Sequence, residues 1–326
     1  MNLNSPTYIV LATFNGADFL EEQIDSLIAQ TETQWTLLIH DDGSSDDTVR
    51  IINDYSQNDE RIQVLVHAGD SSPSALVNFS TLLANVFEQG AEYVFFCDQD
   101  DVWDADKLTV MLEHLRHLEG TETHPCLIHH DLEVVNESLE TIAGSFIRLM
   151  QLQPSDEHKP QRLISRNEVT GCAMACNRAL LEIALPISGQ AVMHDWWLAL
   201  CAGYFGRLAF VPDKLLKYRQ HGENAIGAKS FWYALNPFTN WVAGWHRGDK
   251  DFVKSVEQAT AFRDTKIDRF DKGSEAFTAL DLYCGLVTAT RRQRLKTLRQ
   301  CGLWRSHLVL NIVMVMRMLL LPSKSD

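Results

Sequence analysis

The hydrophobic residues of the first hundred positions form short apolar runs that alternate with longer amphipathic stretches. Four runs have the length and the aliphatic or aromatic composition of buried strands: 8–12, 35–39, 62–66 and 93–96. The stretches between them carry apolar residues at helical spacing, and two of them start near residues that favour helix starts, Asp18 and Ser44. Strands that alternate with helices predict a doubly wound α/β sheet that is mostly parallel.

The pattern changes in the later part of the chain. A further strand is predicted over 126–135, a helix over 173–181, and another helix that begins near Asp195. The remaining predicted segments are two short extended pieces at 210–212 and 215–218, helices at 251–263 and 275–299, and an apolar segment at 308–321. We therefore predict an α/β domain over residues 1–225 and a helical region over residues 226–326, which we expect to contact a membrane or a partner.

Three carboxylates follow the fourth apolar run within four positions. Asp98, Asp100 and Asp101 would stand at the carboxyl end of a buried strand, where open α/β sheets bind their ligands. Carboxylates this close repel one another unless a cation neutralises them, and hard oxygen ligands suit Mg²⁺ or Mn²⁺. The alternative is a solvated acidic turn that caps a helix starting near Asp104. The aromatic strand before the cluster favours the metal site.

Polar residues also follow the first two predicted strands and begin a later helix. Asn15 follows the first strand, and Asp41 and Asp42 follow the second. Each could be ordinary turn chemistry beside a glycine, but the carboxyl ends of parallel strands share one rim, so we expect these side chains near the acidic cluster. Asp195, next to two tryptophans, is either a helix cap or a partly desolvated general base.

Charge is distributed unevenly along the 326 residues, whose net charge is −14. Residues 1–150 carry 27 acidic side chains against five basic ones, which argues against nucleic acid as a partner. Residues 285–326 carry eight basic side chains against one acidic one, which indicates contact with an anionic surface.

Aromatic residues gathered over 231–245 fit either core packing or contact with a bilayer. Residues 308–321 are too short and too polar for a transmembrane span, so an interfacial helix and a helix packed on protein both stay open.

The seven cysteines lack the spacing of a disulfide framework, which favours free thiols in a reducing cytosol. Cys172 and Cys176 are four apart on a predicted helix without a second Cys/His pair nearby, so we expect packing rather than zinc binding. The first six residues have neither a basic region nor an apolar core, so no signal peptide is expected.

Six motifs occur in one order along the chain: Thr13-Phe14-Asn15-Gly16, Asp41-Asp42-Gly43-Ser44-Ser45-Asp46-Asp47-Thr48, Asp98-Gln99-Asp100-Asp101, Thr170-Gly171-Cys172, His194-Asp195 and Arg219-Gln220-His221-Gly222-Glu223-Asn224. In this combination the chain resembles family 2 glycosyltransferases of the GT-A fold, most closely the bacterial rhamnosyltransferase-like members that build surface polysaccharides. The likeness covers roughly residues 7–225. It implies an inverting transfer from a nucleotide-activated sugar, with a divalent metal, Mg²⁺ or Mn²⁺, on the diphosphate.

The resemblance also implies roles for individual residues. Asp195 matches the catalytic base of the family. The residues that match positions against the nucleotide sugar are Thr13, Asn15, Asp41, Asp42, Asn78, Asp98 and Asp100. Those that match positions at the metal are Asp100, Asp101 and His221. Related sequences often carry a basic residue in the loop after the third strand, near the nucleotide, whereas residues 69–77 contain none.

We therefore predict a cytoplasmic glycosyltransferase that works at the inner face of a bacterial membrane. The expected donor is dTDP-L-rhamnose, with UDP-hexoses as the alternative, and the expected acceptor is a lipid-linked oligosaccharide of a surface polysaccharide such as O-antigen or capsule. One alternative is a haloacid-dehalogenase-like phosphatase, because Asp98 to Val102 fits its Asp-x-Asp-x-Val motif, although that motif normally follows the first strand. Another is a nucleotide-sugar-binding subunit without catalysis, against which Asp195 and His221 argue.

Overall fold

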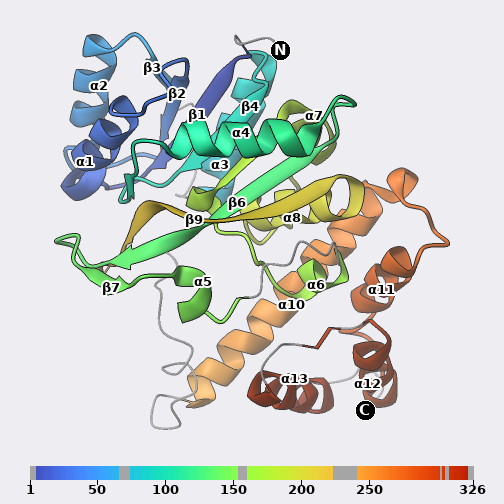
Figure 1. Cartoon of the computed structure of the whole chain (residues 1–326). Helices are drawn as coiled ribbons and strands as arrows, with labels where there is room; N and C mark the ends of the chain where they lie inside the picture. Colours follow the sequence, from blue (N-terminus) through green and yellow to red (C-terminus); the bar gives the residue numbers. More distant parts are fainter. Residues whose placement is uncertain are drawn as a thin grey trace.

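Within the described residues, nine strands form one curled sheet at the centre of the molecule (Figure 1). The computed structural model describes residues 5–65, 74–152, 160–222, 241–301, 303–304 and 308–321, without the side chains of 241–247, 308 and 310. The strands are β1 (Thr7–Thr13), β2 (Thr36–Asp41), β3 (Ile62–Leu65), β4 (Tyr93–Cys97), β5 (Val102–Trp103), β6 (Cys126–Val135), β7 (Thr141–Ala143), β8 (Met174–Asn177) and β9 (Arg207–Arg219). Their order is β3-β2-β1-β4-β8-β6-β9-β5, and β7 pairs with β6 beside this path.

The first four strands run parallel, as the sequence predicts. β1 pairs with β2 on one side and β4 on the other, so that Tyr8 lies opposite both Thr36 and Val94, and β2 pairs with β3. All five residues of β4 are buried, as expected for a strand covered on both faces. The carboxyl ends of these strands therefore meet at one edge, and the predicted polar residues Asn15, Asp41 and Asp98 lie at or just beyond that edge.

Helices cover both faces of the sheet. Those of the described residues are α1 (Ala17–Ile28), α2 (Thr48–Asn58), α3 (Ala75–Glu88), α4 (Lys107–Glu119), α5 (Phe146–Leu149), α6 (Pro160–Ser165), α7 (Arg178–Ala184), α8 (His194–Phe205), α10 (Trp241–Thr265), α11 (Glu275–Cys284), α12 (Arg291–Gln300) and α13 (Leu308–Leu320), with 3₁₀ turns η1 (Gly171–Ala173) and η2 (Ile267–Arg269). Figure 1 shows α4 in front of the sheet and α3 and α8 behind it.

Two hydrophobic cores follow from the alternation of side chains along the strands. Ile9 and Leu11 of β1 belong to the core under α1, α2 and α4, whereas Val10 belongs to the core under α3, α7 and α8. Successive strand residues point to opposite faces, so an uninterrupted apolar strand serves both cores at once. The predicted doubly wound, mostly parallel α/β fold is confirmed.

The helix predicted over 173–181 is wrong in its first half. Met174–Asn177 forms β8, an antiparallel strand inserted between β4 and β6, and all four of its residues are buried. The helix α7 starts only at Arg178, after the Asn177 side chain caps it by accepting a hydrogen bond from Leu180 N. Cys172 and Cys176 therefore do not share a helix. An apolar run of this length is compatible with a helix or with a buried strand. Here it forms a strand because it pairs with β4 on one side and β6 on the other.

Three other boundaries differ from the prediction. Residues 210–212 and 215–218 belong to one long strand, β9, which pairs parallel with β6. The helix predicted over 275–299 is two helices, because α11 ends before Gly285 and α12 starts with a capping box made by Thr290 and Gln293. The side chains of the aromatic segment 231–245, most of the predicted loop 69–77, and Asn224 lie outside the described residues.

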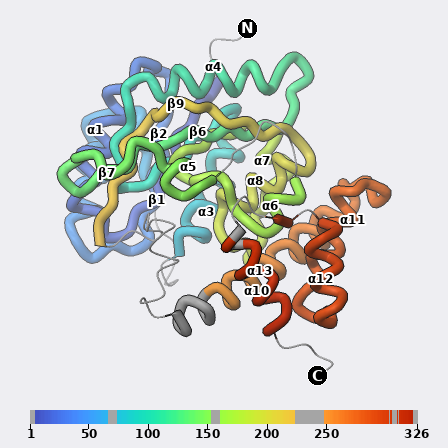
Figure 2. The backbone as a smooth tube through the Cα atoms, turned by 60° about the horizontal axis from the view of Figure 1, so that its bottom comes forward, coloured from blue at the N-terminus to red at the C-terminus, as the bar shows by residue number. Residues whose placement is uncertain are grey.

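The C-terminal helices share a core with the sheet domain. Phe262 of α10 and Leu280 of α11 are fully buried and belong to the same hydrophobic cluster as Trp197 of α8. Figure 2 shows α10 to α13 gathered at one end of the molecule, with α10 running toward α6 and α8. Among the described residues, no helix has both the length and the apolar character that crossing a membrane requires.

Candidate functional site

A hydrogen bond between two predicted site residues joins the carboxyl ends of strands β1 and β2. Thr13 Oγ1 donates to Asp41 Oδ2 at 2.9 Å. The other oxygen of Asp41 accepts from the backbone N–H groups of Gly43 and Ser44, at 3.0 and 2.8 Å, and Gly43 adopts a φ of 87°. Asp41 therefore shapes the turn after β2 as well as lining the rim, and Gly43 supplies the left-handed backbone that this turn requires.

Asn15 links the two turns that follow β1 and β2. Its side-chain oxygen accepts from Ser45 N at 2.8 Å, and its own N–H donates to Ser44 Oγ at 2.7 Å. The residue has a φ of 47°, a left-handed conformation that asparagine tolerates better than most residues. The structure thus brings Thr13, Asn15 and Asp41 together, as the sequence predicts.

Asp42 and Asn78 are buried behind this rim. Asp42 Oδ2 accepts from Ser74 N at 2.5 Å, which fixes the start of α3. Asn78 holds the end of β2 from behind, since its Nδ2 donates to His40 O at 3.1 Å and its Oδ1 lies 2.9 Å from His40 Nδ1. These contacts place the polar atoms of Asn78 at the end of β2, and its contact with a nucleotide stays a prediction.

Gln99 is a functional-site residue that the sequence analysis did not single out. Its side chain accepts from Phe14 N at 2.9 Å and donates to Phe14 O at 3.1 Å, so it pairs with the loop after β1 as a neighbouring strand would. A Cβ on Gly16 would lie 2.3 Å from the Gln99 side chain, so a larger residue there would displace the Gln99 amide from the loop. Its position between two aspartates was the available signal, but nothing local shows that it spans two strand ends.

The acidic cluster after β4 divides into an inner and an outer part. In the inner part, Asp98, Asp101 and Cys172 bring their ligand atoms within 4.8 Å of one another. Burial, followed by the charges of Asp100 and Asp195, raises the pKa of Asp98 to about 7, and burial with its acidic neighbours raises the pKa of Asp101 well above its usual value. Burial raises the pKa of the Cys172 thiol as well.

Lys107 places one buried positive charge beside this inner part. Its ammonium donates to Cys172 O at 2.7 Å and lies 3.6 Å from the centre of the Trp103 ring. Burial lowers its pKa to about 8 against the opposing effect of the nearby thiols and carboxylates. A lysine at the start of a helix is ordinarily exposed to solvent, so the sequence alone does not predict that Lys107 is buried beside the acidic cluster.

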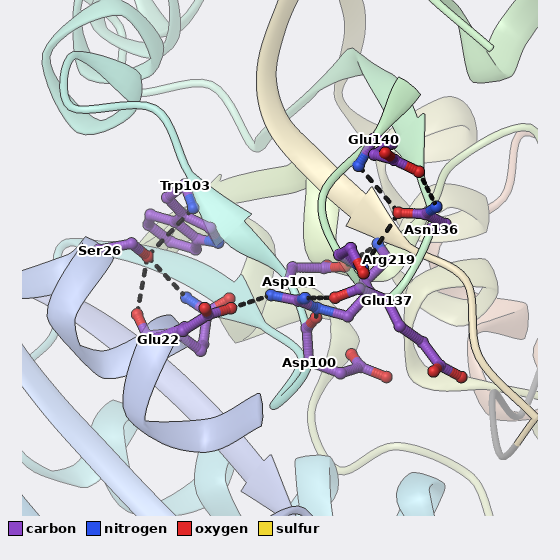
Figure 3. A network of polar contacts seen from close by, with 11 residues as sticks. Glu22, Ser26, Asp100, Asp101, Trp103, Asn136, Glu137, Glu140 and Arg219 are labelled. Carbon is purple, nitrogen blue, oxygen red and sulfur yellow. Dashed lines mark hydrogen bonds and ion pairs between the residues drawn. The ribbon is translucent and has the colours of Figure 1, made fainter. Parts of the chain in front are cut away.

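Arg219, at the end of β9, fixes the backbone of the acidic loop. Its N–H donates to Asp101 Oδ1 at 3.2 Å and its Nε donates to Asp100 O at 2.9 Å. The guanidinium also donates to Glu137 O and to the Glu22 carboxylate, as Figure 3 shows. Because Arg219 is almost fully buried, its charge stabilises the loop without facing solvent. Arg219, the first residue of the predicted motif 219–224, thus holds the acidic loop in place through hydrogen bonds.

The outer part of the cluster is the pair formed by Asp100 and His221. His221 Nε2 lies 2.8 Å from Asp100 Oδ2, and both side chains are partly exposed at the rim. Both residues are predicted metal ligands, and the structure brings them together although 121 positions separate them. The Phe19 ring lies 4.8 Å from the His221 ring and limits how far it can turn.

Asp195 lies in the first turn of α8, where its side chain is buried. Its Oδ1 accepts from Trp196 N at 2.5 Å. Burial raises its pKa to about 7, while hydrogen bonds from Trp196 N, the Asn167 side chain and Gly171 N act in the opposite direction. Since Asp195 also raises the pKa of Asp98, the two carboxylates share one electrostatic environment. Asp195 is therefore a buried carboxylate that is electrostatically coupled to the acidic cluster.

The neighbours of Asp195 hold it rigidly. His194 stacks on Phe79 at 3.9 Å between ring centres and on Phe96 at 5.5 Å, and burial lowers its pKa to about 3. It is a neutral core residue rather than a ligand. A Cβ on Gly171 would lie 3.2 Å from His194 Nε2 and 3.7 Å from Asp195 Oδ2, so the glycine lets the loop approach the base closely.

The residues present fit a bound divalent cation. Asp101 Oδ2 is buried and has no hydrogen-bond partner in the part of the chain that the structure describes. Burial first, and the charges of neighbouring carboxylates second, raise the pKa values of Asp98 and Asp101, although the buried side chains of Lys107 and Arg219 lie close by. A divalent cation would remove the repulsion between these carboxylates, and carboxylate and imidazole are suitable ligands.

Fold and site together define a glycosyltransferase of the GT-A type, and comparison with known proteins agrees. The profile of Glycosyl transferase family 2 matches residues 8–182, and the chain belongs to this family. It is 33% identical over 226 residues to the dTDP-rhamnosyl transferase RfbG of Shigella flexneri, covering 67% of this chain and 74% of that one. The predicted family and enzyme class are confirmed, and the phosphatase alternative is not supported.

Two solved structures share the fold at low sequence identity. The crystal structure of S. aureus TarS 1–349 in complex with UDP-GlcNAc superposes with a TM-score of 0.54 at 14% identity, over 96% of this chain and 88% of that chain. The mannosyltransferase PcManGT from Pyrobaculum calidifontis, in complex with GDP-Man and Mn²⁺, gives a TM-score of 0.52 at 14% identity, over 96% of this chain and 79% of that one. They confirm the GT-A fold.

Proposed function

We propose that this protein transfers a sugar from a nucleoside diphosphate donor to a lipid-linked saccharide acceptor, with inversion at the anomeric carbon and Asp195 as the general base. The observation that carries the proposal is the buried Asp195 carboxylate at the start of α8, electrostatically coupled to the acidic cluster at the carboxyl edge of the sheet. A nucleotide-binding rim and a single desolvated base are the two parts that a one-step transfer requires.

The reaction is a single displacement. Asp195 takes the proton of one acceptor hydroxyl, whose oxygen forms a bond to the anomeric carbon while the bond from that carbon to the diphosphate oxygen breaks. The nucleoside diphosphate leaves with the electron pair, and attack opposite the leaving group inverts the anomeric centre. With a pKa of about 7, Asp195 is ionised in part at neutral pH and still basic enough to accept a proton.

The rim residues hold the donor. Thr13, Asn15, Asp41 and Asp42 are proposed to contact the nucleoside, directly or through the turns that they fix, and Asp98 and Asp100 the ribose and diphosphate. Asn78 supports them from behind β2. The residues proposed for the metal are Asp100, Asp101 and His221. Mg²⁺ or Mn²⁺, when bound, neutralises charge on the departing diphosphate.

We favour Asp100 and His221 over Cys172 as metal ligands. The Asp100–His221 pair stands at the exposed rim, where a nucleotide can complete the coordination. Burial raises the pKa of the Cys172 thiol well above its usual value, and a protonated thiol is a poor ligand for a hard cation.

The proposed donor is dTDP-L-rhamnose, because RfbG is named a dTDP-rhamnosyl transferase and the similarity covers most of both chains. A UDP-hexose is the alternative. The proposed acceptor is a lipid-linked oligosaccharide of a surface polysaccharide, which places the enzyme at the inner face of the cell membrane, in the cytoplasm. The proposal includes no nucleic-acid partner, since the rim is acidic.

Thermal stability with a panel of ligands tests this proposal. Ligands that bind only the folded state raise the melting temperature. We expect dTDP or UDP with Mn²⁺ or Mg²⁺ to stabilise the protein more than GDP or inorganic phosphate, and incubation with the matching nucleotide sugar and acceptor to release the nucleoside diphosphate. A response to phosphate alone, or to none of the nucleotides, would contradict the proposal.

Two matched variants identify the metal ligands. We expect Asp100→Asn to abolish the metal-dependent part of the nucleotide stabilisation, whereas Cys172→Ser should retain it. If Cys172→Ser abolished the effect and Asp100→Asn kept it, the inner cluster of Asp98, Asp101 and Cys172 would be the metal site instead.

A further inference from the structure

Helix α13 has an apolar exposed face and an inward-facing charged residue, which is the opposite of an ordinary surface helix. The one charged residue of α13, Arg317, turns inward and pairs with Asp249 of α10 at 2.8 Å. The described side chains of the helix that are exposed are all apolar: Val309, Ile312, Met316, Leu319 and Leu320, between 37% and 62% exposed. Steps of three and four residues put them on one face. A continuous apolar face of this kind marks an interaction site.

Buried contacts fix α13 in this orientation. The guanidinium of Arg294, on α12, is fully buried and donates to Leu321 O at 2.6 Å and to Met318 O at 3.4 Å. The same group donates to Leu286 O and Val287 O in the turn after α11. Because these bonds satisfy the carbonyls at the end of α13, the helix cannot simply roll to bury its apolar face.

The neighbouring helix adds positive charge to this end of the molecule. α12 packs against α13, as Figure 2 shows, and its exposed residues include Arg292, Lys296 and Arg299. Two apolar side chains in this part of the chain are also exposed, Leu295 of α12 at 37% and Trp304, four residues after that helix, at 48%. In a chain with a net charge of −14, residues 285–326 carry eight basic side chains against one acidic one, so this part of the chain is complementary to an anionic partner.

We propose that α12, α13 and Trp304 form a docking surface for an anionic lipid bilayer, with α13 lying in the plane of the headgroup region. At 13 residues, α13 is about 20 Å long, shorter than the ~30 Å hydrocarbon core, so it lies in the interface rather than crossing it. Apolar side chains enter the acyl boundary while basic side chains contact anionic headgroups. The surface rests on the proposed function in one respect, because a lipid-linked acceptor resides in the bilayer.

Vesicle co-sedimentation tests the docking surface. The full chain is mixed at low salt with vesicles of phosphatidylcholine, alone or with phosphatidylglycerol. We expect binding only to the anionic vesicles, and at least a tenfold weaker affinity for Ile312→Glu. The matched control is Val49→Glu, at a similarly exposed apolar position of helix α2 (43% exposed), which should bind as the unaltered protein does. The double variant Arg292→Glu/Lys296→Glu should also lose binding, because it reverses the charge.

Three results of the vesicle experiment would each overturn the proposal: no binding of the unaltered protein to anionic vesicles, equal binding of Ile312→Glu, or equal binding to neutral vesicles. A dimer in light scattering that Ile312→Glu converts to a monomer would also overturn it, since a second copy would then cover α13. Nucleotide stabilisation, measured on each variant, reports separately on the donor site. Vesicle binding without any nucleotide effect would therefore contradict the proposed function and leave the docking surface standing.

Discussion

Asp195 combines burial, a fixed orientation and an acidic neighbour in one side chain. Removal of its charge should lower kcat about 10²- to 10⁴-fold, the usual contribution of a general base, while the donor site stays intact. The variant is Asp195→Asn, which keeps the size of the side chain. Turnover is measured by nucleoside diphosphate release, and donor binding by thermal stabilisation. Unchanged turnover would exclude Asp195 as the base, and lost nucleotide binding would indicate a structural role.

The same carboxyl should make the stability of the metal-free protein depend on pH. Its pKa is about 7 when folded against 3.8 as its ordinary value, so the folded state holds a proton that the unfolded state has released. Its stabilising contribution is complete below about pH 4 and is lost as pH rises through about 7. From pH 5 to pH 8 the loss amounts to about 2 to 3 kcal/mol, since one pKa unit corresponds to about 1.4 kcal/mol.

Urea unfolding at pH 5 and pH 8, with a chelator present, measures this effect. Asp195→Asn has no carboxyl to titrate at this position, so its free energy of unfolding should fall by about 2 to 3 kcal/mol less between the two pH values than that of the unaltered protein. Burial keeps the pKa values of Asp98 and Asp101 raised in both proteins, and the loss of the Asp195 charge lowers the pKa of Asp98 in the variant, which acts in the same direction as the loss of the Asp195 carboxyl. An identical fall in the two proteins would show that Asp195 is not desolvated.

At the scale of single elements, Asn78 decides whether α3 supports the rim or contacts the donor. Asn78→Ala would remove the hydrogen bonds from Asn78 to His40 O and to the His40 ring, at a cost of about 1 to 3 kcal/mol in the free energy of unfolding. The control is Asn85→Ala, on the same helix but partly exposed, which should cost much less. Both are measured by urea unfolding. An unchanged stability with a raised KM for the donor would instead make Asn78 a nucleotide contact.

The elements that could be predicted from the sequence are those whose cause is local. β4 is a run of apolar residues, predicted over 93–96 and observed over Tyr93–Cys97, and α3 lies in a stretch that was predicted to be helical from its apolar spacing. β8 could not be predicted, because Met174–Asn177 forms a strand only where β4 and β6 leave room for it. Its small and apolar residues are equally compatible with a helix.

The candidate site shows the same division between local and distant causes. Motif residues at strand ends, such as Asn15 and Asp41, come together because parallel strands end at one edge. Gln99 and Lys107 act through partners 85 and 65 positions away, and such contacts leave no pattern in a single sequence. Residues that bind the backbone of distant loops therefore could not be predicted from the sequence.

At the scale of the whole molecule, the shared core bears on the predicted division near residue 225. Phe262 of α10 packs edge-on against Trp197 and Tyr204 of α8, at 5.6 and 5.4 Å between ring centres. A hydrogen bond from Val192 N to Gln258 Oε1 at 2.7 Å joins the same parts. The two predicted regions meet through an apolar interface, so we expect them to unfold as one cooperative unit.

Phe262→Ala tests this cooperativity. Truncation of a fully buried phenylalanine lowers the free energy of unfolding by about 3 to 5 kcal/mol. In a single cooperative unit, this loss lowers the stability of every element by the same amount. Native-state hydrogen exchange should therefore show the same loss of protection in the slowest amides of β1 and β4 as in those of α10 and α11. If only the C-terminal helices lost protection, while the strands and the nucleotide stabilisation kept their values, residues 226–326 would be a separate folding unit. The docking helix would then be carried on a domain that moves independently of the site.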